Sequence, residues 1–221
     1  MRKIYFILCL IFCVTWSCNP AAKDTSKKKT KLQANVDTVN SFRIDSFWVT
    51  PKRLMKYGAI QESGADTLDL VMCGDYMFSP FGVIDIKSDL KTSKLFKFII
   101  TDTTAADGGG NSLKIQKLKF KSSKLILLFP DPGDNSDRSS HIVKGEIYDK
   151  DVQFINGVMI GMKIKDFYRK FFEHFPIELM NDYKVIVFDS CVEDLKHVYT
   201  FNNGELMSVK FYGNYVIKVD Y

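Results

Sequence analysis

Apolar and polar residues alternate over short stretches along most of the chain after residue 36. These stretches are rich in β-branched and aromatic side chains, and they cover residues 42–49, 67–73, 94–101, 112–120, 124–129 and 142–148. Such alternation predicts β-strands with one buried face. Turn-rich segments separate them at 61–66, 74–82, 102–111 and 130–140. We therefore expect an antiparallel sheet or sandwich over residues 36–150, with one competing short helix at 51–57 that begins at Pro51.

A different period marks residues 164–175. Apolar side chains recur there at positions 164, 167, 168, 171, 172 and 175, which is the spacing of one helix face. Charged and polar residues occupy the opposite side, and Pro176 ends the pattern. The spacing predicts an amphipathic helix whose aromatic stripe is buried in a core.

Strand-like runs surround this helix, at 152–155, 184–189, 197–202, 205–212 and 215–219. Asn203-Gly204, between two of them, is a strong signal for a type I′ hairpin turn, since both central residues need positive φ. The expected fold class is α+β and mostly antiparallel β. A C-terminal amphipathic helix packs on an antiparallel meander in residues 151–221, and the β-rich region 36–150 precedes it.

The N-terminal segment has the pattern of an export signal. Two basic residues precede Ile4–Val14, an uninterrupted apolar run whose length is typical of a signal peptide and too short to span a bilayer. Cys18 follows directly after the small residue Ser17. This resembles a bacterial lipoprotein signal, in which the cysteine is acylated and becomes the first mature residue. We expect a signal peptide over 1–17 and lipidation at Cys18; an ordinary signal cleaved elsewhere and an uncleaved anchor are the alternatives.

Charge divides the chain at the same end. The whole sequence has 31 basic and 26 acidic side chains, a net charge of +5. Seven of the basic residues and one acid precede residue 36, which leaves 24 basic and 25 acidic residues in the remainder. The part expected to fold is therefore not a basic protein, and we expect no nucleic-acid partner. Residues 18–35 read as a polar tether. Its lysines at 27–31 either contact anionic lipid headgroups or are only solvated.

Two cysteines, Cys73 and Cys191, remain for the folded region after the signal and Cys18 are set aside. In an exported domain they form either one disulfide or two separate buried thiols. Neither belongs to a C-x-x-C motif, so we expect no redox motif and no zinc site.

The C-terminal third carries a recognisable order of motifs. NGVMIGM (156–162) comes first, then the predicted helix ending in proline, then the hairpin FNNGEL (201–206). This order is similar to the module of the SmpA/OmlA (BamE-like) outer-membrane assembly lipoproteins and of the β-lactamase-inhibitor-protein fold, and to many Bacteroidetes lipoproteins with no assigned role. The resemblance implies a scaffold for contacts, and it transfers no functional residue.

The sequence offers only isolated candidates for catalytic residues. The three histidines lie far apart in sequence and outside any zinc-binding spacing. Cys191 with His197 and Asp189 has the residue types of a thiol nucleophile and its base. Because they flank a predicted turn without an elbow or oxyanion donors, we do not expect catalysis there.

One acidic loop has the residue types of a weak calcium site. Asp131, Asp134 and Asp137 supply carboxylate oxygens, but the loop lacks the order and terminal glutamate of an EF-hand. We expect a solvated loop between two strands.

These observations predict a binding protein of the cell envelope. We expect a non-catalytic, lipid-anchored protein without a cofactor that binds an envelope protein or has a structural role at the membrane. The alternative is a lipid-anchored hydrolase or small-ligand binder with residues from distant loops. No aspartate follows Cys18 at the second mature position, which favours outer-membrane attachment, and we expect a periplasm-facing domain.

Overall fold

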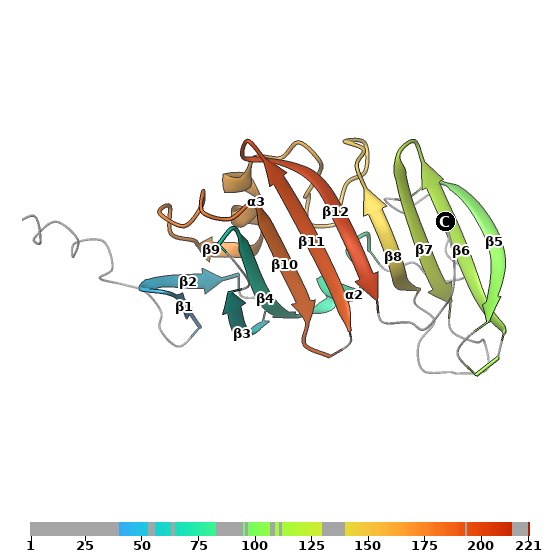
Figure 1. Ribbon diagram of the computed structural model, residues 1–221, viewed down its shortest axis with the longest axis horizontal. Helices are drawn as coiled ribbons and strands as arrows, with labels where there is room; N and C mark the ends of the chain where they lie inside the picture. The colour runs from blue at the N-terminus through green and yellow to red at the C-terminus, as the bar shows by residue number, and fades with distance from the viewer. Residues whose placement is uncertain are drawn as a thin grey trace, which may run out of the picture. The chain divides into compact units, whose positions relative to one another are not determined.

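The computed structural model describes residues 40–52, 56–62, 65–82, 95, 97–106, 109–110, 112–129, 140–192, 194–213 and 221. The expected signal peptide, tether, acidic loop and last strand (215–219) lie outside these residues. Residues 37–221 form one compact unit. The described part is mostly β-strand, and its strands form a nine-stranded and a three-stranded sheet (Figure 1). The prediction of a mostly antiparallel β fold is confirmed.

The larger sheet has the strand order β3-β4-β10-β11-β12-β8-β7-β6-β5. Its strands are β3 (Lys56–Glu62), β4 (Thr67–Cys73), β5 (Ile99–Ala106), β6 (Ser112–Phe120), β7 (Ser123–Phe129), β8 (His141–Ile147), β10 (Val185–Ser190), β11 (Leu195–Asn202) and β12 (Glu205–Gly213). All neighbours pair antiparallel except β4 and β10, which are parallel. One sheet thus contains strands from both halves of the sequence.

The described elements outside the large sheet are a smaller sheet and two helices. β1 (Phe42–Ile44), β2 (Phe47–Pro51) and β9 (Phe172–His174) form the smaller sheet, and the helices are α2 (Asp75–Phe78) and α3 (Ile164–Phe171). Tyr76 of α2 and Phe167 of α3 both contact Tyr199 of β11. The two helices therefore cover the same face of the large sheet, which we call the inner face; the opposite side is the outer face.

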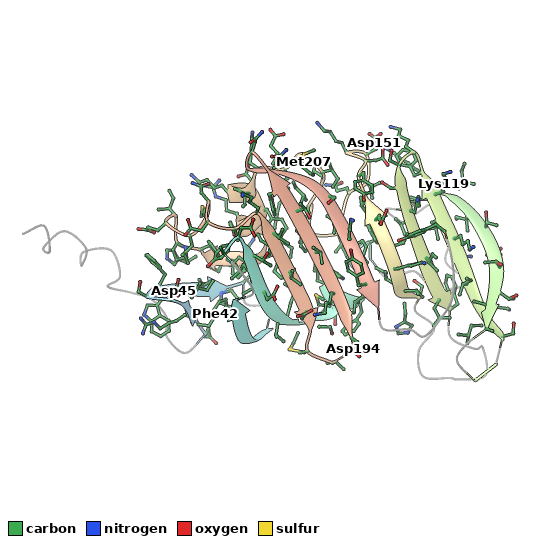
Figure 2. The ribbon with its side chains drawn as sticks, viewed as in Figure 1. Phe42, Asp45, Lys119, Asp151, Asp194 and Met207 are labelled. Carbon is green, nitrogen blue, oxygen red and sulfur yellow. A yellow bond between two sulfur atoms is a disulfide. The ribbon has the colours of Figure 1, made fainter. Side chains whose placement is uncertain are left out.

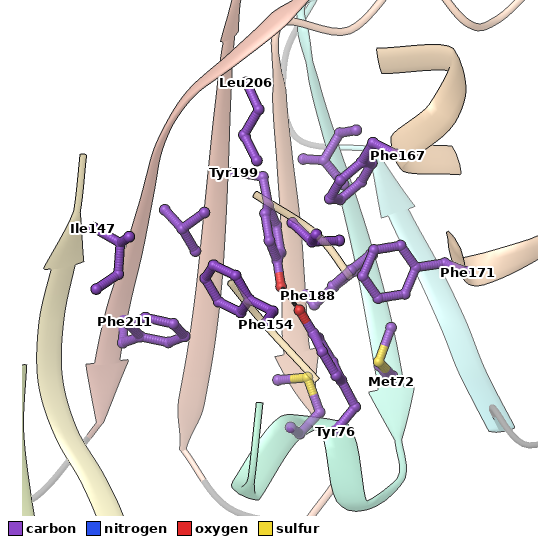
Figure 3. Close-up of a cluster of buried hydrophobic side chains, with 14 of the residues drawn as sticks. Met72, Tyr76, Ile147, Phe154, Phe167, Phe171, Phe188, Tyr199, Leu206 and Phe211 are labelled. Carbon is purple, nitrogen blue, oxygen red and sulfur yellow. Dashed lines mark hydrogen bonds between the residues drawn. The ribbon is translucent and has the colours of Figure 1, made fainter. Parts of the chain in front are cut away.

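Aromatic rings of α3 make the centre of the core. Phe167 lies 4.8 Å from the ring of Tyr199, and Phe171 lies 4.8 Å from the ring of Phe188 on β10 (Figure 3). All four of these side chains are fully buried. Each buried aromatic ring contributes roughly 1.5–3 kcal/mol of hydrophobic stabilisation. This packing is the main reason for the position of α3 on the sheet.

The predicted helix over 164–175 is too long. It ends at Phe171, because Phe172 is extended and begins β9, which pairs with β2. Phe172 and Phe175 remain buried. Three of the four residues beyond Phe171 that were predicted as helical form the short strand β9 instead, since hydrogen bonding to β2 outweighs a helical preference that is weak for phenylalanine and histidine.

Two predictions near the N-terminal end of the domain are wrong. The single strand predicted over 42–49 is a hairpin, in which Asp45 has φ of 49° and turns the chain between β1 and β2. Aspartate tolerates this left-handed backbone, so the turn needs no glycine. The competing helix at 51–57 is also wrong: Pro51 ends β2 and Lys56–Glu62 is β3. The strand structure of these segments follows from pairing of β2 with β9 and of β3 with β4.

Two further predictions fail at strand boundaries. β5 begins at Ile99, not at residue 94, and it continues through Ala106, a stretch predicted as a turn. Eight residue pairs with β6 stabilise this threonine-rich strand. Residues 152–155 are not a strand; they lie in a turn with one isolated bridge, Gln153 to Met159. By contrast, Asn203 and Gly204 form the predicted turn between β11 and β12, with φ of 49° and 72°.

Gly145 marks the closest packing within the sheet. It lies on β8, opposite Leu125 of β7 and Phe211 of β12. A Cβ atom at this position would be 2.5 Å from Leu125 Cδ1 and 2.9 Å from Phe211 Cδ2. Real Cβ atoms do not approach carbon so closely, so the two flanking side chains fill the space that the glycine leaves.

We predict that Gly145→Ala lowers the free energy of unfolding by about 1–3 kcal/mol, because the added methyl group overpacks the inner face. Chemical denaturation followed by tryptophan fluorescence measures the change. In the same chain, Leu125→Val removes the nearest atom and should recover part of the loss. Equal stability of the wild type and Gly145→Ala would contradict this account of the packing.

Candidate functional site

Several residues predicted from the sequence lie outside the described part of the chain. They are the lipidation residue Cys18 and the three calcium candidates Asp131, Asp134 and Asp137. Within the described ranges, no three His, Cys, Asp or Glu side chains gather in a way that suits a metal ion. No helix in the described ranges is both long enough and apolar enough to cross a bilayer.

Cys73 and Cys191 form a disulfide, with 5.3 Å between their Cα atoms. The parallel pairing of β4 with β10 brings them together: Ser190, the last residue of β10, pairs with Met72, Cys73 ends β4, and Cys191 directly follows β10. The bridge therefore closes the carboxyl ends of the one parallel strand pair in the described sheets. It joins residues 118 positions apart.

The bridge rules out the thiol nucleophile considered from the sequence. The sulfur of Cys191 is bonded to Cys73, and His197, the base considered with it, is fully buried on β11. Asp189 instead forms an ion pair with Lys196, at 2.9 Å. The three residues therefore make no catalytic arrangement in this structure.

His197 belongs to a buried chain of hydrogen bonds. Its Nε2–H donates to the carbonyl oxygen of Met77 at 3.0 Å, which leaves Nδ1 as the acceptor for the hydroxyl of Tyr199 at 3.3 Å. The oxygen of Tyr199 in turn accepts from the hydroxyl of Tyr76, at 3.0 Å (Figure 3). This assignment of the tautomer follows from the carbonyl, which can only accept. The chain fastens α2 to β11 inside the core.

Burial keeps this chain uncharged. It lowers the pKa of His197 to about 3, although the hydrogen bond to the Met77 carbonyl opposes part of the shift. Burial also raises the pKa of Tyr76 above its ordinary range, against weaker opposing hydrogen bonds from Tyr199 and Asn156. These groups are sealed from solvent, so we assign them a structural role.

The outer face carries the more promising site. A cavity of about 390 Å³ lies over β5, β6 and β7, and its lining comprises Ile99, Thr101, Lys117, Leu118, Lys119, Lys124, Leu125 and Tyr221. We call it the lysine cavity. Figure 2 shows Lys119 on β6. Three of these lining residues are lysines, and the lining contains no acidic residue.

The strand register concentrates these charges. Lys119 pairs directly with Lys124 across the β6–β7 ladder, so two ammonium groups share one face. Lys117 lies two residues along β6, on the same side. Like charges directly opposite each other destabilise a sheet. An anion bound between them would remove this cost.

Tyr221 lies against the same lysines. Its ring is 4.9 Å from Lys124 Nζ and 4.8 Å from Lys144 Nζ, and both contacts are cation–π interactions. Partial burial, with the nearby charge of Glu146, raises its pKa to about 12. The phenol is neutral at neutral pH, as an unshifted tyrosine also is, and it can donate a hydrogen bond. Glu146 of β8 pairs with Lys124 on the outer face and supplies negative charge near the cavity.

The sequence contains a signal for this site that net charge hides. Lys117 and Lys119 alternate with apolar residues in β6, and Lys124 follows the tight turn after it. Alternation places the first two on one face, and the hairpin returns the third to that face. Residues 36–221 contain 24 basic and 25 acidic residues, so their net charge does not reveal the local excess of lysines on this face. The arrangement suits an anion with an apolar portion.

Comparison of the chain with protein-family models, with curated proteins and with solved structures finds no match. Three features of the described residues bear on function: the disulfide at the end of β4 and β10, the buried histidine chain, and the lysine cavity. Of these three, only the cavity combines exposed charge with a volume that a ligand group can enter.

We predict that acid destabilises the protein through His197. The imidazole has a pKa of about 3 in the folded state against 6.5 in the unfolded chain, so the unfolded state binds the extra proton first. Its stabilising contribution is complete above pH 6.5 and falls by about 1.4 kcal/mol per pH unit below that, until about pH 3. Unfolding free energies of the wild type and His197→Leu measured across this range test it; parallel curves would contradict the assignment.

We predict that removal of the disulfide by Cys73→Ser, Cys191→Ser or both lowers the free energy of unfolding by about 2–5 kcal/mol, mainly because the unfolded chain gains freedom. Denaturant titration measures the change, and chemical reduction of the wild type should reproduce it. The singly and doubly substituted chains should agree closely. A double variant as stable as the wild type would show that the bridge constrains nothing.

Proposed function

We propose that this protein is exported from the cytoplasm, anchored by lipid in the cell envelope, and acts by binding instead of by catalysis. The disulfide between Cys73 and Cys191 is the observation that carries the proposal. Disulfides form and persist in oxidising compartments such as the periplasm, and they are rare in cytosolic proteins. The sequence supports the same compartment through the apolar run that ends shortly before Cys18.

The anchor in this proposal is an acyl group on Cys18. Residues 1–17 serve as the signal peptide and residues 18–35 as a polar tether, so the domain that follows residue 36 remains close to the bilayer. The missing aspartate after Cys18 favours the outer membrane, with the domain facing the periplasm. The partners are membrane lipid, through the acyl group, and a protein of the envelope.

The scaffold we propose is a helix packed on an antiparallel meander, like the SmpA/OmlA (BamE-like) and β-lactamase-inhibitor-protein modules. The contacts of Phe167 with Tyr199, and the turn at Asn203-Gly204, support it. In such a scaffold the sheet presents a broad surface for contacts, which suits a role in binding.

The lysine cavity favours a second candidate, a lipid-anchored protein that binds a small ligand. A volume of about 390 Å³ is at the lower end of the range of ligand sites, and its lining combines apolar and cationic groups as such sites do. A hydrolase is less well supported, because the cysteine of the one candidate nucleophile–base pair in the described residues is in a disulfide.

We predict that radioactive palmitate labels the wild-type protein in cells and does not label Cys18→Ala, because the cysteine thiol is the acylated group. Cys73→Ser is the matched control, since it removes another cysteine and should leave the label unchanged. Label that persists in Cys18→Ala would overturn the anchor.

A further inference from the structure

We propose that the lysine cavity is a binding site for a phosphate group carried on a compound with a small apolar portion. The proposal rests on the proposed function only for the source of the ligand, a phospholipid headgroup or a soluble phosphate compound of the periplasm. The site itself follows from the residues that line the cavity.

The charge of the cavity selects an anion. Lys119 and Lys124 are fixed opposite each other by the β6–β7 register, and Lys117 adds a third ammonium group on the same face. Ammonium groups bind phosphate as point charges, without the paired geometry of arginine. A phosphate group has enough oxygens to accept from all three lysines, which a single carboxylate does less well.

Uncharged donors complete the polar side of the site. The hydroxyl of Thr101 on β5 and the phenol of Tyr221 both belong to residues in the lining. A phenol is protonated at neutral pH, so the hydroxyl of Tyr221 can donate a hydrogen bond to an anion.

The remaining wall of the cavity is apolar, and this is the observation from which we infer the apolar portion of the ligand. Ile99 is 74% exposed although it lies at the start of a strand that pairs along its whole length. The side chains of Leu118 and Leu125 face the inner side and are buried in the core, so Ile99 and the ring of Tyr221 supply the apolar wall of the cavity. An aliphatic portion of the ligand would cover this side chain and recover the hydrophobic free energy that its exposure forfeits.

Glu146 is the acid that opposes binding. It pairs with Lys124 across the β7–β8 ladder and with Lys210 across the β8–β12 ladder. Its charge acts on Tyr221, so it lies within electrostatic reach of the cavity. Removing it should strengthen the attraction for an anion, whereas removing a lysine should weaken it. Mere damage to the sheet cannot produce these opposite changes.

The test uses the mature chain, residues 18–221, carrying Cys18→Ala, so that neither an acyl group nor the apolar run Ile4–Val14 takes part in binding. Two probes separate the two sources: phosphatidylcholine vesicles with or without phosphatidylglycerol, measured by co-sedimentation, and glycerol phosphate, measured by calorimetry. The variants are Lys117→Gln, Lys119→Gln and Lys124→Gln, singly and together, and Glu146→Gln. The matched control replaces Lys165, Lys170 and Lys184 by glutamine, which removes the same charge outside the cavity. The lysines of the tether are present in every chain.

We expect about fivefold weaker binding for each cavity lysine that is replaced, and stronger binding for Glu146→Gln. Binding to phosphatidylglycerol vesicles that glycerol phosphate does not displace would identify a lipid headgroup as the source. Binding of glycerol phosphate with the same dependence on the lysines would identify a soluble compound. Both results support the site.

The proposal is overturned if neither probe distinguishes the triple cavity variant from the triple control, or if both triple variants lose binding equally. Loss of palmitate label in Cys18→Ala, or its persistence, does not affect this measurement. Failure of the lysine cavity and failure of the lipid anchor are therefore separate results.

Discussion

The parallel pairing of β4 with β10 is the constraint on which the rest of the fold depends. Parallel neighbours cannot be joined by a tight turn, and here the chain between them contains β5 to β9 and both described helices. The whole of that segment must fold so that β10 arrives beside β4 in the correct register. Only then do Cys73 and Cys191 come within bonding distance. Such long-range contacts make folding slow compared with a fold of local hairpins.

The register of this pair also positions the core. It places Phe188 of β10 and Leu70 of β4 side by side on the inner face, where the rings of α3 cover them. Antiparallel pairing then adds β11, whose His197 and Tyr199 point to the same side. A buried histidine is costly unless both ring nitrogens have partners. The carbonyl of Met77 and the hydroxyl of Tyr199 supply them.

The alternation of apolar and polar residues predicted strands best where one face of the strand is buried and no distant strand changes the local structure by pairing. The strand expected at 67–73 has the observed bounds of β4, and the turn at Asn203-Gly204 is local chemistry that the sequence specifies by itself. The helix at 164–175 was predicted too long because the apolar spacing through Phe172 and Phe175 is helical, and only pairing with β2, a partner distant in sequence, makes Phe172–His174 a strand. No local feature of the sequence indicated that β4 and β10 pair in parallel.

The candidate site shows the same limit. Lysines at 117 and 119 are visible as an alternating pair, but a single sequence does not reveal that Lys124 and Tyr221 meet them. That meeting depends on the β6–β7 register and on a contact between residues almost a hundred positions apart. The net charge of residues 36–221 hid the excess of lysines on the outer face, since it sums the charges of both faces of the sheet. Charge counted by strand face is the more informative quantity.

The bridge between β4 and β10 has a mechanical consequence. If the N-terminal end of the domain is pulled against a partner held by the C-terminal hairpin, the force passes along β4, through the two sulfur atoms and into the chain after Cys191. The chain between the two cysteines, which are 118 positions apart, carries no tension and cannot be drawn out. Fully extended, it would add roughly 400 Å of length. The covalent link thus limits how far a pulled molecule can lengthen, and the strands that form the lysine cavity lie within the protected span.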